Sequence, residues 1–438
     1  MMTQAPPRSL GPGQTLAYSL YAVPLIATTA AISTFIPPYY SQGLGLPLTL
    51  VATALIAIRL IDAVCDPAIG LAIDHANFRQ KHRPWLLIAL PPYLAAASLL
   101  FFPVPSLVGL PYLIGTGGLV YIAFTIAQVA HQAWAAALES DPRRLSRLFG
   151  FREVAVIVGV LGVFAVAALA SHLHGSDVAV QARAAGQFIL VSITLATLVT
   201  WAFTPDSGRG DMAHGDAGWA VLKPFLLSRN FILLSLAMLV FNAGWTAMGT
   251  MSFFVAEHLY RAPKFFALGL VLTFAVAPFG MIAWMKLAAR LGDHATVRLA
   301  CLLLAGVFLM LPVAIRFGVA GLIAVQTLLG LGFGAGPYLL RSITGALANS
   351  YVKRTGREVR GAAFAMINFF DKLGSGLGAA ALLPLAALGF DPNGLVDDAA
   401  RRALLAVATL VPLAGLASAA ALIHAMKMGG EADQSITP

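Results

Sequence analysis

The sequence has few charged residues and few cysteines for its length. Of its 438 residues, 11% are charged and 59% are hydrophobic, whereas a globular domain in water has about 25% charged residues. This balance excludes a soluble globular protein. The two cysteines, Cys65 and Cys301, both lie within apolar runs, which excludes a disulfide framework.

Motifs for catalysis and for nucleic-acid binding are also missing. We find no nucleotide-binding loop, metal-ligand cluster or activated nucleophile with a spacing that supports an enzyme. The net charge is +9, but the basic residues lie in short clusters between apolar segments, as membrane topology requires. We therefore expect neither an enzyme nor a nucleic-acid-binding protein, and neither a metal nor a cofactor.

Long apolar runs occupy nearly the whole chain. A run of about 20 apolar residues can cross the hydrocarbon core of a bilayer as a helix. Polar breaks separate twelve such runs, so the sequence predicts an all-α membrane protein with twelve transmembrane helices. The predicted spans are 15–40, 47–74, 85–103, 107–138, 148–172, 184–204, 224–259, 265–291, 296–315, 318–348, 360–389 and 400–426.

A polar stretch divides these spans into six and six. We expect an N-terminal six-helix bundle over residues 1–204, a cytoplasmic central loop over 205–223, and a C-terminal six-helix bundle with a short tail over 224–438. Loops on one side of the spans hold nineteen Lys and Arg residues, and loops on the other side hold six. Because basic residues bias short loops toward the cytoplasm, we expect a plasma (inner) membrane protein with both termini cytoplasmic.

The second predicted span contains an unusual group of charges. Asp62 and Asp66 are four residues apart and share one helical face with Arg59. Two neighbouring carboxylates can bind a cation or share a proton, which predicts ion coupling. The alternative is a buried ion pair that only positions helices. We expect Pro67 and Gly70 to loosen the helix here and to free backbone groups as further ligands.

Polar side chains follow one face of the fourth predicted span. Thr125, Gln128 and Gln132 are spaced three and four residues apart, so this stripe must face the protein interior or a water-filled path. His131 either handles protons or is held by a bond to another helix. The predicted substrate-binding residues are Gln128, His131, Gln132, Trp134, Tyr21, Arg341 and Asn368.

Charged residues also interrupt the tenth and eleventh predicted spans. Asp371 and Lys372 are adjacent and so point about 100° apart on a helix. We expect Lys372 to face the cavity and neutralise the acid pair while Asp371 pairs elsewhere, and the alternative is a local pair that packs helices. Arg341 stands alone in its span, either as an anion-binding group or as a side chain that reaches toward the cytoplasm.

Three segments carry a resemblance to a known family. The segment from Arg59 to Asp74, followed by Arg83-Pro84-Trp85, resembles the second helix and the following loop of the glycoside-pentoside-hexuronide:cation symporters, a branch of the major facilitator superfamily. The segment from Asp141 to Arg152 is similar to that family's loop between helices four and five, and Thr355 to Lys372 is similar to the start of its eleventh helix. The resemblance implies two six-helix bundles that rock around a central cavity.

The resemblance also implies roles for individual residues. It places the cation site on Asp62, Asp66 and Thr125, with Lys372 beside it. A sugar-transporting member of that family has an asparagine ligand between the two acids where this chain has Cys65. A thiol is a poor ligand for a hard cation such as Na⁺, so we expect H⁺ coupling, with Na⁺ as the alternative.

The two carboxylates that bind galactoside hydroxyls in that member of the family fall on Ile26 and Gln128, neither of which can act as a carboxylate. We therefore expect a glycoside or a hexuronide and do not assign a galactoside. The predicted gating residues are Arg59, Asp74, Arg83, Asp141 and Arg152. Arg59 lies within the second span, and the other four lie in or beside basic loops that either latch the cytoplasmic side by ion pairs or only set topology.

The sequence thus predicts a secondary active transporter that works by alternating access as a monomer in the bilayer. Its expected partners are a small-molecule substrate and a coupling cation. The alternatives are a carrier of lipids or other amphiphiles with the same fold, a facilitator without coupling, and a membrane sensor or assembly factor that transports nothing.

Overall fold

The computed structural model describes residues 10–76, 82–175, 177–205, 219–262, 265–381, 385 and 397–426, and these contain helices and no strands. Contacts within the chain define two compact units. The first unit is Met1–Gly215 with Ala348–Ala362, and the second is Asp216–Leu347 with Ala363–Pro438. The segment 348–362 therefore packs with the first unit, although the sequence prediction placed it in the C-terminal bundle.

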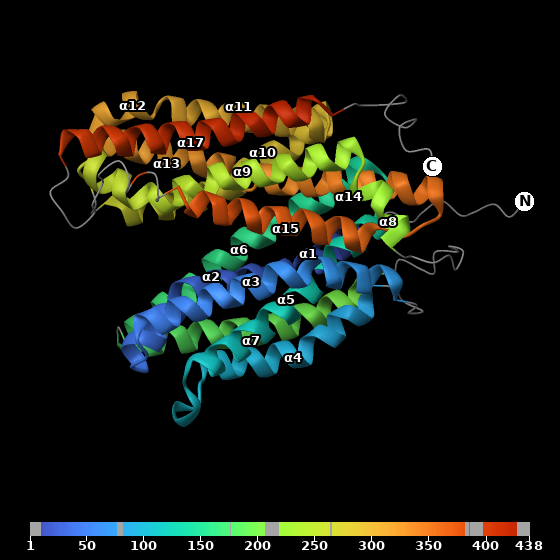
Figure 1. The fold of residues 1–438 in the computed structure, drawn as a ribbon, viewed down its shortest axis with the longest axis horizontal. Coiled ribbons are helices and arrows are strands. Elements are labelled where there is room, and N and C mark those ends of the chain that lie inside the picture. The colour runs from blue at the N-terminus through green and yellow to red at the C-terminus, as the bar shows by residue number, and fades with distance from the viewer. Residues whose placement is uncertain are drawn as a thin grey trace, which may run out of the picture. The chain divides into compact units, whose positions relative to one another are not determined.

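The first unit is a bundle of long helices, drawn from blue to green in Figure 1. They are α1 (Pro12–Ser19), α2 (Ala22–Pro38), the π-helix η1 (Tyr39–Gly43), α3 (Leu48–His75), α4 (Arg83–Phe101), the 3₁₀ turn η2 (Pro105–Leu107), α5 (Leu110–Leu138), α6 (Pro142–His174) and α7 (Val178–Phe203).

Small residues allow these helices to approach closely. Both α3 and α4 pack against α5, and α2 packs against α6 and α7. A Cβ atom on Gly159 of α6 would lie 2.3 Å from the carbonyl oxygen of Val23, and one on Gly186 of α7 would lie 2.4 Å from Phe101. No side chain fits at these crossings, so glycine sets the spacing between the helices.

The remaining helices are drawn from yellow-green to red in Figure 1 and belong to the second unit, apart from residues 348–355 and 360–362, which belong to the first unit. They are α8 (Trp219–Leu226), α9 (Arg229–Phe254), the π-helix η3 (Val255–Leu259), α10 (Phe266–Leu291), α11 (Asp293–Leu309), α12 (Leu311–Ala314), the 3₁₀ turn η5 (Ile315–Phe317), α13 (Gly318–Gly332), α14 (Ala335–Thr355), α15 (Arg360–Ala379) and α17 (Asp398–His424). Helix α17 packs against α9 and α11, and α10 packs against α13.

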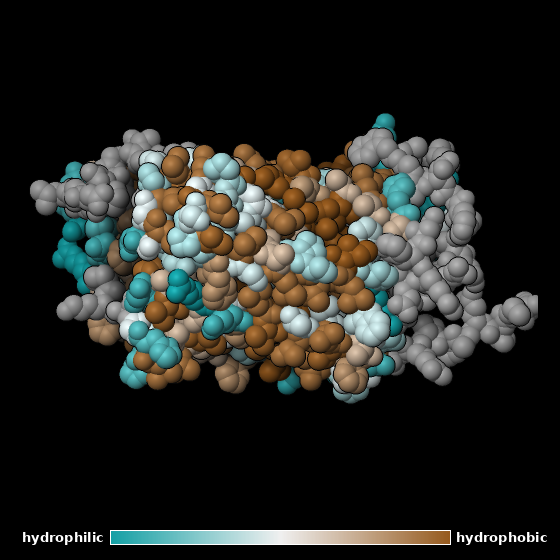
Figure 2. Space-filling view, turned by 90° about the horizontal axis from the view of Figure 1, so that it is seen from below, coloured by the Kyte–Doolittle hydropathy of each residue, from teal (hydrophilic) through white to brown (hydrophobic). Residues whose placement is uncertain are grey.

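The helices account for the predicted spans. In the described part of the chain, nine helical segments are long and apolar enough to cross a membrane. The other three predicted spans correspond to α3 and α15, which carry charges in their interiors, and to α11, which has 17 residues. Figure 2 shows one face on which hydrophobic residues predominate along the middle.

Three predicted spans are interrupted where the sequence suggested continuous helices. The first breaks between α1 and α2, because Pro24 has no N–H for the carbonyl of Leu20. The ninth breaks before Pro312 at the start of α12. The tenth breaks between α13 and α14 at Gly334, whose φ is 79°. Most of the predicted central loop, residues 206–218, and the loop residues Arg79 and Lys81 lie outside the described part of the chain.

Candidate functional site

Two buried carboxylates of α3 form the centre of the candidate site in the first unit. Asp62 and Asp66 lie one turn apart, and each is only 1% exposed. Helix α3 runs through Pro67 without a break, so the expected loosening of the helix does not occur. Proline removes only the bond to the carbonyl four residues earlier, at Ala63. The site is therefore a rigid helical face that presents two acids.

Helix α5 supplies a hydroxyl to this face. The Thr125 side chain is buried and donates a hydrogen bond of 2.9 Å to Asp62 Oδ1. The two helices are close because α5 has glycine where α3 has isoleucine: a Cβ on Gly117 would lie 2.4 Å from Ile58 Cδ1. The pairing of Thr125 with the acids, which the family resemblance implied, is present within one unit.

Two further residues of α3 border the acids. Cys65 is half-buried and is not part of a disulfide. Arg59 is largely exposed, and its guanidinium lies 5.1 Å from the centre of the Tyr121 ring. A cation over an aromatic face is attracted electrostatically, so Arg59 contacts α5 through Tyr121.

His131 of α5 contacts α1, the first part of the interrupted first span, through hydrogen bonds and ring stacking. Its Nε2 lies 2.9 Å from the carbonyl oxygen of Tyr18, which can only accept, and the Tyr18 hydroxyl donates to the carbonyl of His131 at 2.6 Å. The two rings stack at 3.9 Å, and the Tyr21 ring lies 5.0 Å from His131. Of the two roles that the sequence left open, these contacts are those of a histidine bonded to another helix.

Buried polar atoms line the same interior. Gln132 and Trp134 are fully buried, and Gln128 is partly buried. Among the described residues, the Tyr121 hydroxyl, His131 Nδ1 and Trp134 Nε1 are buried without a hydrogen-bond partner. A buried donor or acceptor without a partner is costly, so these three atoms are available to a polar ligand.

Arg152 of α6 lies deeper than a gating residue in a loop would. It is 4% exposed, and its Nη1 lies 4.0 Å from Oε2 of Glu153, which is also buried. The sequence analysis did not single out Glu153, because a Glu beside the basic loop after the fourth span carries no motif of its own.

The second unit contains three of the predicted residues, Arg341, Asn368 and Lys372. Arg341 Nη2 lies 2.8 Å from Asp371 Oδ2, so Arg341 does not stand alone as the sequence suggested. The partner comes from the neighbouring helix α15, 30 residues away, which the pattern of a single span cannot reveal. Asn368 is buried and Lys372 is half-buried. Lys372 belongs to the second unit and Asp62 to the first, and the placement of Lys372 beside Asp62 stays a prediction.

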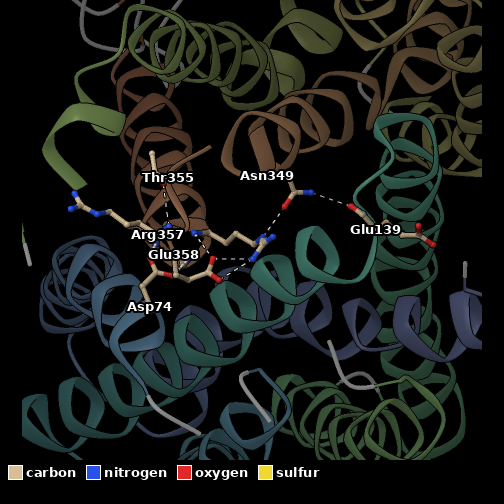
Figure 3. Close-up of polar contacts among 9 residues, drawn as sticks. Asp74, Glu139, Asn349, Thr355, Arg357 and Glu358 are labelled. Atoms are coloured by element: carbon tan, nitrogen blue, oxygen red, sulfur yellow. Dashed lines mark hydrogen bonds and ion pairs between the residues drawn. The ribbon is translucent and has the colours of Figure 1, made fainter. Parts of the chain in front are cut away.

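A network of polar contacts connects segment 348–362 with α3 and with the end of α5 in the first unit (Figure 3). Asp74, 4% exposed, accepts the backbone N–H groups of Gly361 and Ala362, both at 2.7 Å. Its carboxylate thus caps the first turn of α15. A Cβ on Gly361 would lie 2.6 Å from the carbonyl oxygen of Gly70, so only glycine fits here.

The same network contains residues that the sequence did not indicate. Asn349 donates to the carbonyl of Glu139 at 3.1 Å and accepts from Arg360 Nε at 2.7 Å. Arg360 also pairs with Glu358 at 2.9 Å, and the Glu139 side chain accepts the N–H of Leu10 at 3.1 Å. Through Glu139, these bonds connect segment 348–362 and Leu10 to the end of α5.

Two other predicted gating residues have local roles. Asp141 accepts the N–H of Arg143 at 2.8 Å and so caps α6. Arg83 donates to the carbonyl of Trp201, and its guanidinium lies 4.8 Å from the centre of that ring. These contacts join α4 to α7 within the first unit.

Comparisons with known proteins show the family of this chain. The profile of a family described as MFS/sugar transport protein matches residues 17–429. The uncharacterized symporter YnaJ of Bacillus subtilis is 24% identical over 407 residues, which cover 88% of this chain and 85% of that protein. The isoprimeverose transporter of Lactiplantibacillus pentosus is 34% identical over 92 residues, which cover 20% of this chain and 19% of that protein.

Solved structures show the same fold. The Escherichia coli fucose:proton symporter has a TM-score of 0.65 at 14% identity, covering 94% of this chain and 97% of that one. A bacterial homologue of the iron transporter ferroportin has a TM-score of 0.68 at 15% identity, covering 94% and 98%. At such identities the likeness concerns the fold alone, and that fold is the one predicted from the sequence.

Proposed function

Because the chain belongs to the MFS/sugar transport protein family, the glycoside-pentoside-hexuronide symporter branch of the major facilitator superfamily, we propose that it carries a small polar solute by symport with a cation, H⁺ in preference to Na⁺. The family and the fold are those of a multi-pass membrane transporter. The proposed location is the plasma membrane, with both termini in the cytoplasm.

The observation that carries the proposal is the buried group of Asp62, Asp66 and Thr125. Two buried carboxylates one helical turn apart can bind a metal cation or share a proton. In a membrane transporter, buried ionisable groups of this kind are typical of ion pathways. The group is therefore a site whose charge depends on whether a cation is bound.

Coupling follows from a difference in affinity. A transporter alternates between conformations, and a cation bound at the acids stabilises the conformation that binds solute well. The solute then binds the cation-loaded protein more tightly, and by reciprocity the cation binds the solute-loaded protein more tightly.

Proton coupling is favoured by the residue between the acids. Na⁺ prefers several hard oxygen ligands, whereas the thiol of Cys65 is soft. The unbroken backbone of α3 also keeps its carbonyl oxygens in helical bonds, apart from that of Ala63, which faces the ring of Pro67. A proton needs only one carboxylate oxygen.

A glycoside is the proposed solute class. The free Tyr121 hydroxyl, His131 Nδ1 and Trp134 Nε1 are matched to hydroxyl groups of a sugar. The isoprimeverose transporter, a partial match to this chain, is named for a disaccharide. The lack of a carboxylate at Ile26 and Gln128 argues against a galactoside and leaves other glycosides open.

The proposal is tested with purified protein in proteoliposomes. An imposed inward H⁺ gradient should drive accumulation of a radiolabelled glycoside above its external concentration, and a protonophore should abolish this accumulation. Accumulation driven by a Na⁺ gradient alone would show that the coupling ion is Na⁺ and not H⁺. If no glycoside or uronide is transported and only lysolipids raise the thermal stability, the protein is an amphiphile carrier and the proposal is wrong.

A further inference from the structure

The first long helix of each unit ends in a π-helix of five residues. In the first unit α2 continues into η1 at Tyr39–Gly43, and in the second unit α9 continues into η3 at Val255–Leu259. The two π-helices start 216 residues apart. π-Helical turns are rare and are often found at functional sites, so their recurrence at matching places calls for a physical reason.

The residues after each π-helix repeat the same geometry at the same separation. The N–H of Leu46 bonds to the carbonyl of Tyr40 at 3.0 Å, and the N–H of Ala262 bonds to the carbonyl of Ala256 at 2.9 Å. Between donor and acceptor, each turn has one residue with positive φ, Gly45 at 74° and Arg261 at 55°. Segments 39–46 and 255–262 are therefore one structural element present twice.

Each copy also packs against an equivalent neighbour. Segment 39–46 contacts α7, the last long helix of the first unit, and segment 255–262 contacts α17, the last of the second. In the first copy Arg183 Nε donates to the Tyr39 hydroxyl at 3.4 Å, and the Tyr40 hydroxyl donates to the carbonyl of Leu100. In the second copy Val255 and Ala256 lie in an apolar cluster with Leu404 and other residues of α17.

The copies differ in backbone strain. Glycine adopts a positive φ without cost, whereas an L residue with a long side chain does not. Arg261 is the one non-glycine residue with positive φ in the described ranges. Its side chain is exposed, so no buried contact of the side chain requires this conformation. Strain of this kind is found where a segment changes conformation.

We propose that segments 39–46 and 255–262 are a duplicated hinge, and that the strained copy at Arg261 is the one that opens as the protein changes conformation. Strain raises the free energy of the closed turn and leaves that of the opened turn unaltered. The second hinge therefore opens more often than the first, whose Gly45 is relaxed and whose tyrosines are tied by hydrogen bonds. This inference rests on the proposed function in one respect: transport is the process in which the hinge would move.

The test is hydrogen–deuterium exchange of the full-length protein in nanodiscs, without solute and without an ion gradient. Peptides that cover 255–262 should exchange faster than peptides that cover 39–46. Arg261→Gly should slow exchange in 255–262 roughly tenfold, as expected for release of one strained residue, and should raise the thermal midpoint. Arg261→Asn, which removes the charge and tolerates the left-handed region, should act in the same direction.

Two controls separate strain from charge. Arg261→Ala and Arg261→Gln remove the charge and keep the strain, so exchange should stay as in the wild type. Gly45→Ala moves strain into the first turn and should speed exchange in 39–46. Equal exchange of the two segments in the wild type, or equal effects of the Gly and Ala variants at position 261, would overturn the proposal. Because the experiment measures exchange and not transport, its result does not depend on whether the proposed solute and coupling ion are correct.

Discussion

Asp74, near the end of α3, accepts the backbone N–H of Gly361 at 2.7 Å across 287 residues of sequence. The carboxylate also accepts the N–H of Ala362, so it satisfies two of the donors that the first turn of α15 leaves open. Negative charge at this end of a helix is stabilised by the helix dipole. The two bonds need both carboxylate oxygens of Asp74 and a residue without a Cβ at position 361, and both requirements can be tested.

Asp74→Asn should loosen segment 348–362 from the first unit. The amide keeps one acceptor and loses the charge, and hydrogen bonds to charged groups contribute about 1.5–3 kcal/mol. We expect faster hydrogen–deuterium exchange at 361–362 and a lower thermal midpoint. Gly361→Ala should have the same effect, because its Cβ would lie 2.8 Å from Asp74 Oδ1.

The matched control is Asp141→Asn, since Asp141 caps α6 locally and asparagine caps helices about as well as aspartate. This variant should behave as the wild type does. If Asp74→Asn and Asp141→Asn leave exchange at 361–362 equally unchanged, Asp74 does not hold this segment.

Neutralising the acid pair should separate transport from folding. Asp62→Asn or Asp66→Asn should abolish accumulation against a gradient, because the site no longer changes charge when a cation binds. The variants should remain folded and in the membrane, since asparagine is nearly isosteric and removes a buried charge. Uphill uptake and thermal unfolding are measured in parallel. Asp177→Asn, at the cap of α7, is the control, and unchanged uphill uptake in both acid variants would rule out the proposed ion site.

The sequence predicted the parts of the site that depend on spacing within one helix or on a family motif, and it missed the parts that depend on contacts between distant segments. Spacing within one helix placed Asp62 and Asp66 on one face, and the family resemblance added Thr125. Contacts between distant segments left no such trace: Asn349 and Glu139 are 210 residues apart, and neither interrupts an apolar pattern. The duplicated hinge was also invisible, because it is a repeat of backbone geometry, and Tyr39-Tyr40 and Val255-Ala256 share no side chains.

The ion pair between Arg341 and Asp371 should be mainly structural. Both side chains are largely buried and lie 2.8 Å apart, so removing one partner leaves a charge without compensation. Asp371→Asn should destabilise the second unit by about 3–5 kcal/mol, the range for a broken buried pair. The double variant Arg341→Met, Asp371→Leu should recover most of this loss. Thermal unfolding measures both. A stable Asp371→Asn variant that has lost solute binding would instead indicate that the pair acts in substrate recognition.

The choice of coupling ion should depend on Cys65, which lies between the two acids and is half-buried beside them. Cys65→Asn replaces a soft thiol with a carbonyl oxygen, a ligand that Na⁺ prefers. We expect uptake driven by a Na⁺ gradient to appear, and Na⁺ to raise the thermal midpoint of this variant and not that of the wild type. Cys65→Ser, which adds a smaller oxygen ligand, should give a weaker response in the same direction, and Cys65→Ala should give none. If the Asn and Ala variants respond to Na⁺ alike, the residue at this position does not select the ion, and selection must lie with Asp62, Asp66 and Thr125 themselves.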